Sequence, residues 1–362
     1  MTATPIVTVL MPVYNGTAHL AEAVEGVLAQ TLRDFELIVV DDASTDDSAA
    51  LVAAYADPRL RLVRNERNLG QAASLNRGLA LARGPYVARV DQDDVSLPGR
   101  LERQRRLLDE ASDVALVGTR FRAIAQAGRM TEPRGYRLAD YGDFLGALLT
   151  GQSPVAHPTA MFRRDAVLAV GGYDATYAPA DDVKLWIELA RRRHEARVVP
   201  ETLVLYREHP QQQSAARAAL HREQWHRAHR EFVADLCRAP ADVLSLALRH
   251  DDALWRAGVS PHALVAAMRD LDRMLGTVRT TFALRPDEDA ALRRHVARQV
   301  GRGVRLAARI PYCPAPLVRA VLFGLSPLRI PAVRRVLTPL ARRARRRADV
   351  AGLALTRREV SR

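Results

Sequence analysis

The sequence is poor in cysteine and has no long apolar run. Its 362 residues include two cysteines, Cys237 and Cys313, which lie far apart and lack the spacing of a metal site. Neither a disulfide framework nor a zinc motif is therefore expected. No apolar stretch approaches the roughly 18 residues that a membrane-spanning helix needs. Residues 1–5 carry no basic segment ahead of the short apolar run, so we expect no signal peptide and a cytoplasmic protein.

The charges of the chain are unevenly distributed. Residues 1–214 contain 25 Lys and Arg against 28 Asp and Glu, whereas residues 215–362 contain 29 against 13. The whole formal net charge of +13 therefore comes from the C-terminal part. The length allows two domains, and we expect the division at this change of composition. A basic surface attracts an anionic partner, either phospholipid head groups or nucleic acid.

Strand and helix patterns alternate in the first part of the chain. The strand patterns cover residues 6–10, 36–40, 61–63, 86–90 and 114–118. Residues 12–16 form a turn-rich segment after the first strand. Thr17 is the candidate N-cap of the first helical pattern and Ser44 or Thr45 that of the second, and further helical patterns begin after Gly70 and near Pro98. This alternation predicts an α/β fold with a parallel sheet covered by helices. Ligands of such sheets bind beyond the carboxyl ends of the strands.

Carboxylates gather at two of these strand ends. Two follow strand 36–40 and three follow strand 86–90, namely Asp41, Asp42, Asp91, Asp93 and Asp94. Like charges raise one another's pKa and cost several kcal/mol unless a partner neutralises them. A hard cation such as Mg²⁺ or Mn²⁺ suits carboxylate ligands and leaves coordination positions open for phosphate oxygens. The alternative is an acidic turn that caps the helix near Pro98.

A second acidic pair stands at the start of a later helical pattern. Asp181 and Asp182 precede Val183, Trp186 and Ile187, which take helical spacing. Negative charge at a helix N-terminus gains from the helix dipole. Capping alone would explain one of the two aspartates.

Six segments in this order are similar to the successive motifs of family 2 glycosyltransferases. They are residues 9–16 (VLMPVYNG), 40–46 (VDDASTD), 68–70 (NLG) with Asn76, 91–94 (DQDD), 157–159 (HPT) and 171–174 (GGYD). The resemblance extends over most of residues 1–214. It implies the GT-A fold, an α/β/α sandwich that binds a nucleotide, followed here by a mainly helical, basic region over residues 215–362.

The resemblance implies a nucleoside diphosphate sugar as donor, for which we expect a UDP-sugar, with Mn²⁺ or Mg²⁺ on the diphosphate. Pro12 and Tyr14 would border the nucleoside, Asp42 would hydrogen-bond the base, and Asp91 would face the ribose or the sugar. The other expected donor-binding residues are Asn68, Gln71 and Arg207. Tyr14 as a core residue and Asp42 as a helix cap are the alternatives.

The same resemblance assigns the metal and the catalytic base. Asp93 would be the principal metal ligand, Asp94 a second ligand or a support of the loop, and His209 a further candidate. A histidine before a proline can also be structural. Asp182 aligns with the catalytic base, whereas Asp181 stands where the family usually has Glu, so the choice between these two carboxylates stays open.

The implied reaction is inverting sugar transfer to a glycan or a lipid-linked acceptor in bacterial surface polysaccharide assembly. Tyr173, Tyr177 and Trp186 are expected to stack on the acceptor sugar. An alternative enzyme is a sugar-1-phosphate nucleotidyltransferase, which would need a Gly-rich basic loop after the first strand. The alternative outside enzymes is a nucleic-acid-binding protein, although few aromatic residues interleave with the C-terminal arginines to stack on bases.

The region after residue 214 favours helices. Residues 221–232, 244–254 and 290–308 have helical patterns with few strand formers. Residues 334–347 mix apolar and basic side chains, which is typical of an element lying on an anionic membrane. A solvated basic tail is the alternative. We expect peripheral contact with the inner face of the cell membrane and no binding of nucleic acid.

Overall fold

The structure is a computed structural model that describes residues 4–124, 129–210, 212–236, 271 and 273–307. The chain divides into two compact units. The first comprises Met1–Phe144 and Ser153–Ala228, and the second comprises Leu145–Gln152 and His229–Arg362. The expected segments 244–254 and 334–347 lie outside the described residues.

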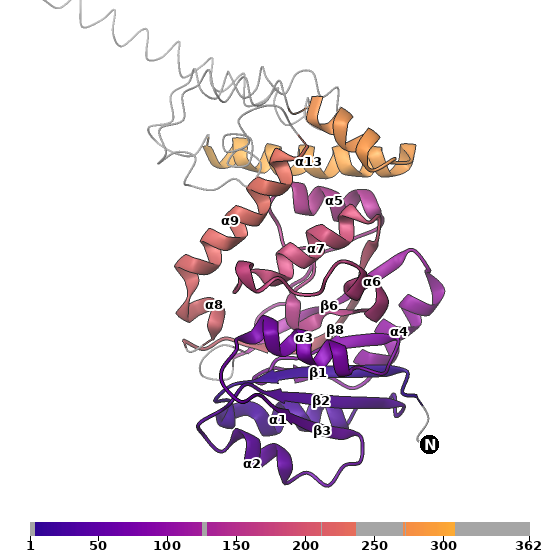
Figure 1. Cartoon of the computed structure of the whole chain (residues 1–362). Helices are drawn as coiled ribbons and strands as arrows, with labels where there is room; N and C mark the ends of the chain where they lie inside the picture. Colours follow the sequence, from indigo (N-terminus) through magenta and orange to yellow (C-terminus); the bar gives the residue numbers. More distant parts are fainter. Residues whose placement is uncertain (1–3, 125–128, 211, 237–270, 272, 308–362) are drawn as a thin grey trace, which may run out of the picture. The chain divides into compact units, whose positions relative to one another are not determined.

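A sheet of eight strands forms the centre of the first unit, with the order β3-β2-β1-β4-β7-β6-β8-β5 (Figure 1). The strands are β1 (Val7–Val13), β2 (Phe35–Asp41), β3 (Leu60–Arg64), β4 (Tyr86–Arg89), β5 (Val95–Ser96), β6 (Val114–Ile124), β7 (Met161–Arg163) and β8 (Glu195–Arg207). The five predicted strands are confirmed as β1, β2, β3, β4 and β6.

The sheet is mixed, whereas the sequence predicted a parallel one. Strands β3, β2, β1 and β4 run parallel, as expected from their βαβ connections. Strand β7 is antiparallel to both of its neighbours, β4 and β6, and β5 is antiparallel to β8. The α/β fold class is confirmed, and the antiparallel strands lie outside the parallel half.

Helices cover both faces of this sheet. Leu20, Val24 and Leu101 from α1 and α4 share a core with Val9 of β1, while Leu10 of the same strand lies under α3. The helices that lie in the first unit or cross its boundary are α1 (Thr17–Leu28), α2 (Ser48–Ala53), α3 (Gln71–Leu81), α4 (Arg100–Glu110), α5 (Tyr141–Leu149), α6 (Arg164–Ala169), α7 (Asp181–Arg191), α8 (Gln213–Ala216) and α9 (Ala218–Ala234). Two short 3₁₀ helices are η1 (His157–Thr159) and η2 (Ala175–Tyr177).

Strand β1 continues through Pro12, where a turn was predicted. Pro12 pairs with Val40 of β2, but the pairing of β1 with β4 ends at Leu10. At Pro12 the strand therefore has a paired neighbour on one side only, and a proline, which lacks an N–H, is tolerated there.

The predicted helix caps were wrong. Helix α1 begins at Thr17 itself, and α2 begins at Ser48. The Ser44 hydroxyl accepts a hydrogen bond from the backbone N–H of Asn15 (3.0 Å), and the backbone N–H of Thr45 donates to the Asn15 side chain (2.9 Å). Their polar groups therefore join the loops that follow β1 and β2 instead of capping α2.

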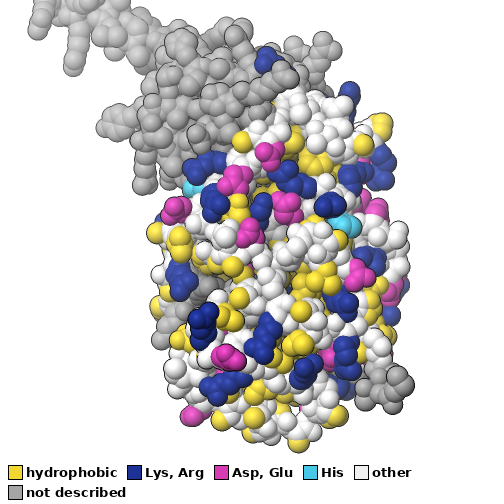
Figure 2. Space-filling model, viewed as in Figure 1, with side chains coloured by type: hydrophobic (Ala, Val, Ile, Leu, Met, Phe, Trp, Pro, Cys, Tyr) yellow, Lys and Arg dark blue, Asp and Glu magenta, His cyan; other side chains and the backbone are white. Residues whose placement is uncertain are grey.

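The described part of the second unit is helical, as predicted. Helix α13 (Pro286–Ala307) covers the predicted segment 290–308, and Phe232 packs edge-on against Phe282 with ring centroids 6.4 Å apart. The His229 ring contacts the Leu149 carbonyl oxygen at 2.9 Å. No helix of the described residues is long and apolar enough to cross a membrane. Basic and acidic side chains are interspersed on the face drawn in Figure 2.

Candidate active site

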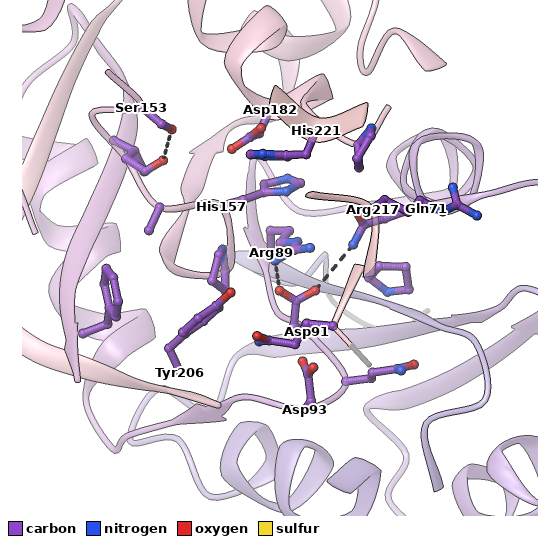
Figure 3. A pocket seen from close by; sticks show the side chains of 18 of the residues that line it. Gln71, Arg89, Asp91, Asp93, Ser153, His157, Asp182, Tyr206, Arg217 and His221 are labelled. Carbon is purple, nitrogen blue, oxygen red and sulfur yellow. Dashed lines mark hydrogen bonds and ion pairs between the residues drawn. The ribbon is translucent and has the colours of Figure 1, made fainter. Parts of the chain in front are cut away.

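A cavity of about 750 Å³ opens in the first unit (Figure 3). Segments that follow the parallel strands line one part of it, and residues from η1, α7 and the region after β8 line another. Of the residues expected to bind the donor, the metal or the acceptor, those that line it are Pro12, Tyr14, Asp42, Asn68, Gln71, Asp91, Asp93, Asp182 and His209. The strand-end rule and the motif order therefore select residues that share one cavity.

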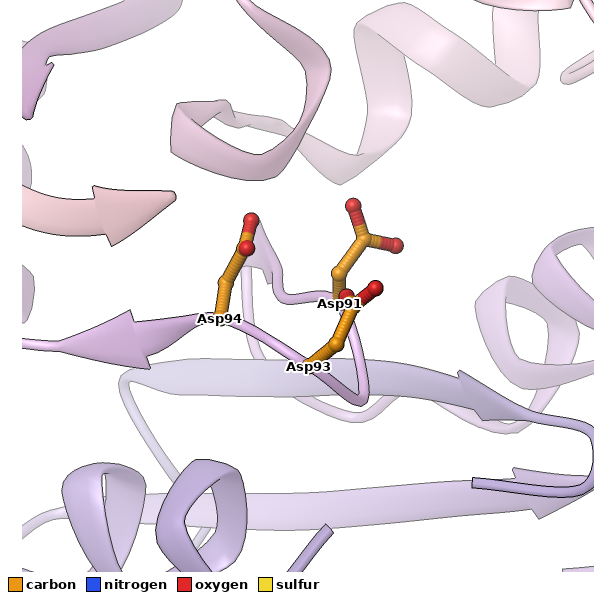
Figure 4. A group of neighbouring side chains, drawn as sticks. All are labelled: Asp91, Asp93 and Asp94. Carbon is orange, nitrogen blue, oxygen red and sulfur yellow. The ribbon is translucent and has the colours of Figure 1, made fainter. Parts of the chain in front are cut away.

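Three carboxylates stand together in the loop between β4 and β5 (Figure 4). Asp91, Asp93 and Asp94 each offer an oxygen, and these oxygens lie within 4.8 Å of one another. Burial and the negative charges of Asp91 and Asp93 raise the pKa of Asp94 well above its usual range. A divalent cation would relieve this repulsion.

The residues present fit such an ion. One Asp94 carboxylate oxygen, Oδ1, accepts a hydrogen bond from the backbone N–H of Arg207 (2.8 Å). The other oxygen, Oδ2, is buried and has no hydrogen-bond partner among the described residues. The His209 Nε2 atom lies 2.8 Å from Asp93 Oδ2, so an imidazole stands beside the carboxylates. Carboxylate oxygens together with one imidazole nitrogen suit Mn²⁺ or Mg²⁺.

Arg207 supports the acidic loop from outside the cavity. Its Nε donates to the Asp93 carbonyl oxygen (3.0 Å), and its Nη2 pairs with Glu22 of α1. It is not among the residues that line the cavity. Arg207 was expected to bind the donor, but in the structure it contacts the acidic loop and does not line the cavity.

Asp42 anchors the loop before α3. Its Oδ1 accepts hydrogen bonds from the Asn65 side chain (2.6 Å) and the backbone N–H of Leu69 (2.9 Å), and its Oδ2 accepts from the N–H of Gly70 (2.8 Å). Gly70 has φ +89°, a conformation that glycine adopts without strain. Asp42 caps no helix here, and its carboxylate faces the cavity with both oxygens already bound.

Tyr14 is an exposed residue at the cavity wall, not a core residue. The residue is 45% exposed. The Gln92 side chain accepts a hydrogen bond from the Tyr14 N–H (2.8 Å) and donates to its carbonyl oxygen (3.2 Å). Gln92, which lies between Asp91 and Asp93, therefore holds in place the loop that carries the Tyr14 ring.

The two aspartates of α7 differ in their access to the cavity. Both lie in the first turn of α7, as predicted, but Asp182 lines the cavity and Asp181 does not. Burial raises the pKa of Asp182 to about 6. Burial and the charge of Asp182 raise the pKa of Asp181 to about 7. Lys184, the single lysine of the chain, pairs with Glu188 (2.6 Å) and not with these carboxylates.

The expected stacking residues are core residues. Tyr173, Tyr177 and Trp186 are each at most 5% exposed, and none lines the cavity. The Trp186 indole N–H donates to the Val155 carbonyl oxygen (3.2 Å), and the Tyr173 hydroxyl contacts His157 Nε2 (3.0 Å). The stacking prediction was wrong, because these rings are buried in the core and do not form the rim of the cavity.

Sequence reasoning missed several residues of the cavity wall. Arg89 of β4 was not predicted as a site residue, although a single charged residue in a buried strand is a signal in itself. Phe121 and Tyr206 stack edge-on at 5.6 Å and supply aromatic surface. Arg217 and His221 line the cavity as well, so its wall continues past residue 214, and the first unit ends at Ala228.

The mixed α/β sheet, with an acidic loop at the carboxyl edge of its parallel half, has the architecture of GT-A glycosyltransferases. The family model for "Glycosyl transferase family 2" matches residues 8–171. The putative glycosyltransferase EpsE of Bacillus subtilis is 34% identical over 213 residues, which cover 58% of this chain and 75% of that protein. The chain belongs to glycosyltransferase family 2.

One further relative is similar in sequence, and two solved structures share the fold. The succinoglycan biosynthesis protein ExoO of Rhizobium meliloti is 42% identical over 107 residues, 30% of this chain and 31% of that protein. TarS residues 1–349 of S. aureus share the fold with a TM-score of 0.53 at 19% identity, over 88% of this chain and 90% of that chain. The mannosyltransferase PcManGT of Pyrobaculum calidifontis, solved with GDP-Man and Mn²⁺, has a TM-score of 0.52 at 22% identity, over 90% and 88% of the two chains.

Proposed function

We propose that this glycosyltransferase moves a sugar from a UDP-linked donor to a hydroxyl of a glycan or lipid-linked acceptor, with inversion at the anomeric carbon. One observation carries the proposal: Asp42, Asp93 and Asp182 come from three distant segments and line one cavity. A structure of TarS contains UDP-GlcNAc, and ExoO is named for succinoglycan biosynthesis. These relatives support a UDP-sugar and a role in surface polysaccharide assembly.

The donor lies along the segments that follow the parallel strands. Pro12 and Tyr14 border the nucleoside, and Asp42 stands where it can accept a hydrogen bond from the base. Asn68 and Gln71 approach from the start of α3, where the backbone amides suit an anion. Asp91 then faces the sugar.

Asp93 and Asp94, with His209, would hold a Mn²⁺ or Mg²⁺ ion, which when bound neutralises negative charge on the departing diphosphate. Asp182 accepts the proton of the acceptor hydroxyl. The acceptor oxygen forms a bond to the anomeric carbon as the bond from that carbon to the phosphate oxygen breaks. The bonding electron pair leaves with the nucleoside diphosphate, so the configuration inverts without a covalent enzyme intermediate.

We also propose that the protein works on the cytoplasmic side of a membrane and contacts it peripherally through residues 215–362. The 29 basic residues against 13 acidic ones in this part support the proposal. Sedimentation with phosphatidylglycerol vesicles tests it, with phosphatidylcholine vesicles as the uncharged control. Equal binding to both would contradict it.

A panel of nucleotide sugars with Mn²⁺ or Mg²⁺, measured as release of nucleoside diphosphate, tests the function. We expect release from at least one UDP-sugar, and a loss of about 10²- to 10⁴-fold in Asp182→Asn. Asp165→Asn is the matched control, because that side chain is 92% exposed and lies outside the cavity. Exchange of pyrophosphate instead of diphosphate release would indicate a nucleotidyltransferase and refute the proposal.

A further inference from the structure

Arg89 is a buried cation on the floor of the cavity with too few hydrogen-bond partners. It is the last residue of β4, and its side chain is 3% exposed. Its Nη1 pairs with Asp91. Within the described residues its guanidinium has no other hydrogen-bond acceptor, and its Nε is buried without a partner. Arg89 nevertheless lines the cavity, so N–H groups of its two Nη atoms are open to what binds there, whereas Nε is buried.

In a neighbouring arginine, Arg100, the protein itself supplies hydrogen-bond acceptors to all three guanidinium nitrogens. Arg100 of α4 is completely buried, and its guanidinium donates to Ser96 Oγ (2.9 Å), Gln104 Oε1 (3.0 Å) and the Arg89 carbonyl oxygen (2.7 Å). A guanidinium has five N–H donors, and leaving them unpaired in the interior is costly. Arg100 meets this need from the protein, whereas Arg89 leaves acceptors to be supplied from the cavity.

The position of Arg89 indicates which part of a substrate supplies them. In Figure 3 its side chain lies between Asp91 and His157, and Asp182 lies on the far side of His157. Its charge lowers the pKa of Asp182, acting against burial, and together with burial it lowers the pKa of His157 well below the usual range. Arg89 therefore lies between Asp91, which is proposed to face the donor sugar, and Asp182, the candidate base. In the proposed reaction the transferred sugar lies between these two carboxylates.

Charge balance favours hydroxyl groups over a sugar carboxylate as the acceptors. Four carboxylates line the cavity and a fifth, Asp94, is buried beside them, whereas the lining cations are three arginines, of which Arg134 is already paired with Glu208 (2.8 Å). A divalent ion and a diphosphate roughly cancel one another. A uronate would add negative charge to a site that already has an excess.

We infer that Arg89 is a specificity residue that donates hydrogen bonds to ring hydroxyls of a neutral transferred sugar. The inference rests on the proposed function. Asp91 holds the guanidinium in place from one side, and its other oxygen, Oδ1, is 3.5 Å from the Gln71 side-chain nitrogen. The planar fork of Arg89 suits two neighbouring hydroxyls, which a lysine could not match.

The test combines changes to the donor with changes to the enzyme. Wild type is assayed with UDP-glucose, UDP-galactose, UDP-N-acetylglucosamine, GDP-mannose and UDP-glucuronate, and then with the 3-, 4- and 6-deoxy forms of its preferred neutral donor. We expect UDP-glucuronate to be at least tenfold poorer in kcat/KM. We also expect at least one deoxy donor to lose about 10- to 100-fold, as for a lost hydrogen bond to a charged group.

The enzyme variants locate this discrimination. In Arg89→Lys and Arg89→Met the same deoxy donor should differ from its parent by less than about threefold, because its partner is gone. Arg134→Met, a change of another arginine of the cavity wall, should keep the full discrimination. The affinity for UDP, measured by calorimetry, should stay within about twofold in both Arg89 variants, which distinguishes a lost sugar contact from a damaged fold.

The outcomes separate the inference from the function. Full discrimination in the Arg89 variants, no discrimination among deoxy donors by wild type, or a preference for UDP-glucuronate would each overturn the inference alone. If neither variant folds, the two wild-type comparisons still decide it. Failure of the wild type to release diphosphate from any donor would overturn the proposed function, and the inference with it.

Discussion

The acid limb of the pH profile reports directly on Asp182. A general base works only when it is ionised, so activity should rise with pH through its pKa. Burial raises that pKa to about 6. Between pH 7 and pH 5 the ionised fraction of such a carboxyl falls about tenfold, and kcat/KM should fall by the same factor. A carboxyl with an ordinary pKa would lose less than about a tenth of its ionised form over this interval.

The assay measures initial rates of diphosphate release from pH 5 to pH 8 at saturating metal. Protonation of Asp94, whose pKa burial also raises, would weaken metal binding and could produce a similar limb. The two causes separate when the Mn²⁺ concentration is increased tenfold, because a limb caused by the metal site moves to lower pH and a limb caused by Asp182 stays. A flat profile down to pH 5, or a limb that moves with metal, would refute the reasoning.

The neighbouring carboxyl provides the control for this assignment. Asp181 does not line the cavity, so Asp181→Asn should retain turnover within about tenfold of wild type, whereas Asp182→Asn should lose about 10²-fold or more. The reverse result would move the base to Asp181. The sequence left that choice open, and the difference in access to the cavity is the reason we assign Asp182.

Three further predictions concern the metal, the core and the nucleoside. EDTA should abolish diphosphate release and added Mn²⁺ or Mg²⁺ should restore it, and Asp94→Asn should raise the half-saturating metal concentration at least tenfold; activity that persists in EDTA would contradict this. Arg100→Leu should lower the free energy of unfolding, measured in urea, by about 3–5 kcal/mol because it leaves buried carbonyls unpaired, whereas the exposed Arg106→Leu should change it little. Tyr14→Ala should weaken UDP binding by about 2- to 12-fold in calorimetry, and an unchanged affinity would remove the ring from the nucleoside site.

The parallel half of the sheet was predictable because its strands are buried on both faces. Such strands carry near-continuous apolar runs, as at residues 9–13 of β1 and 37–40 of β2. Strands β5 and β7 have two and three residues, and their pairing with β8 and β4 joins distant segments, so no local pattern indicates them. The caps failed for a related reason, since Ser44 and Thr45 bond with Asn15, thirty residues away in the chain.

The residues of the candidate site divide in the same way, into those that the pattern of the parallel strands predicts and those that it does not. In the parallel half the register sets Val13 beside Asp41, and the N–H of Asp42 donates to the Val13 carbonyl oxygen (2.7 Å). The strand-end rule alone therefore brings Asp42 and the loop after Pro12 together. Asp182 follows no strand of that half, because it opens α7. Only the family motif predicted that Asp182 shares a site with the acidic loop, and no local sequence pattern predicted this.

The two sides of the cavity are built differently. The donor half is held by backbone register and by hydrogen bonds such as those from Gly70 and Leu69 to Asp42, so its shape is fixed by the main chain. The opposite wall is formed by side chains that approach from η1 and the regions around α7 and β8. In the proposed reaction the acceptor enters on that side, so we expect substitutions there to change specificity without disturbing the sheet. Arg89 lies where the two halves meet, at the end of a parallel strand and against the antiparallel β7, and its unsatisfied donors are the part of the fixed half that can distinguish one sugar from another.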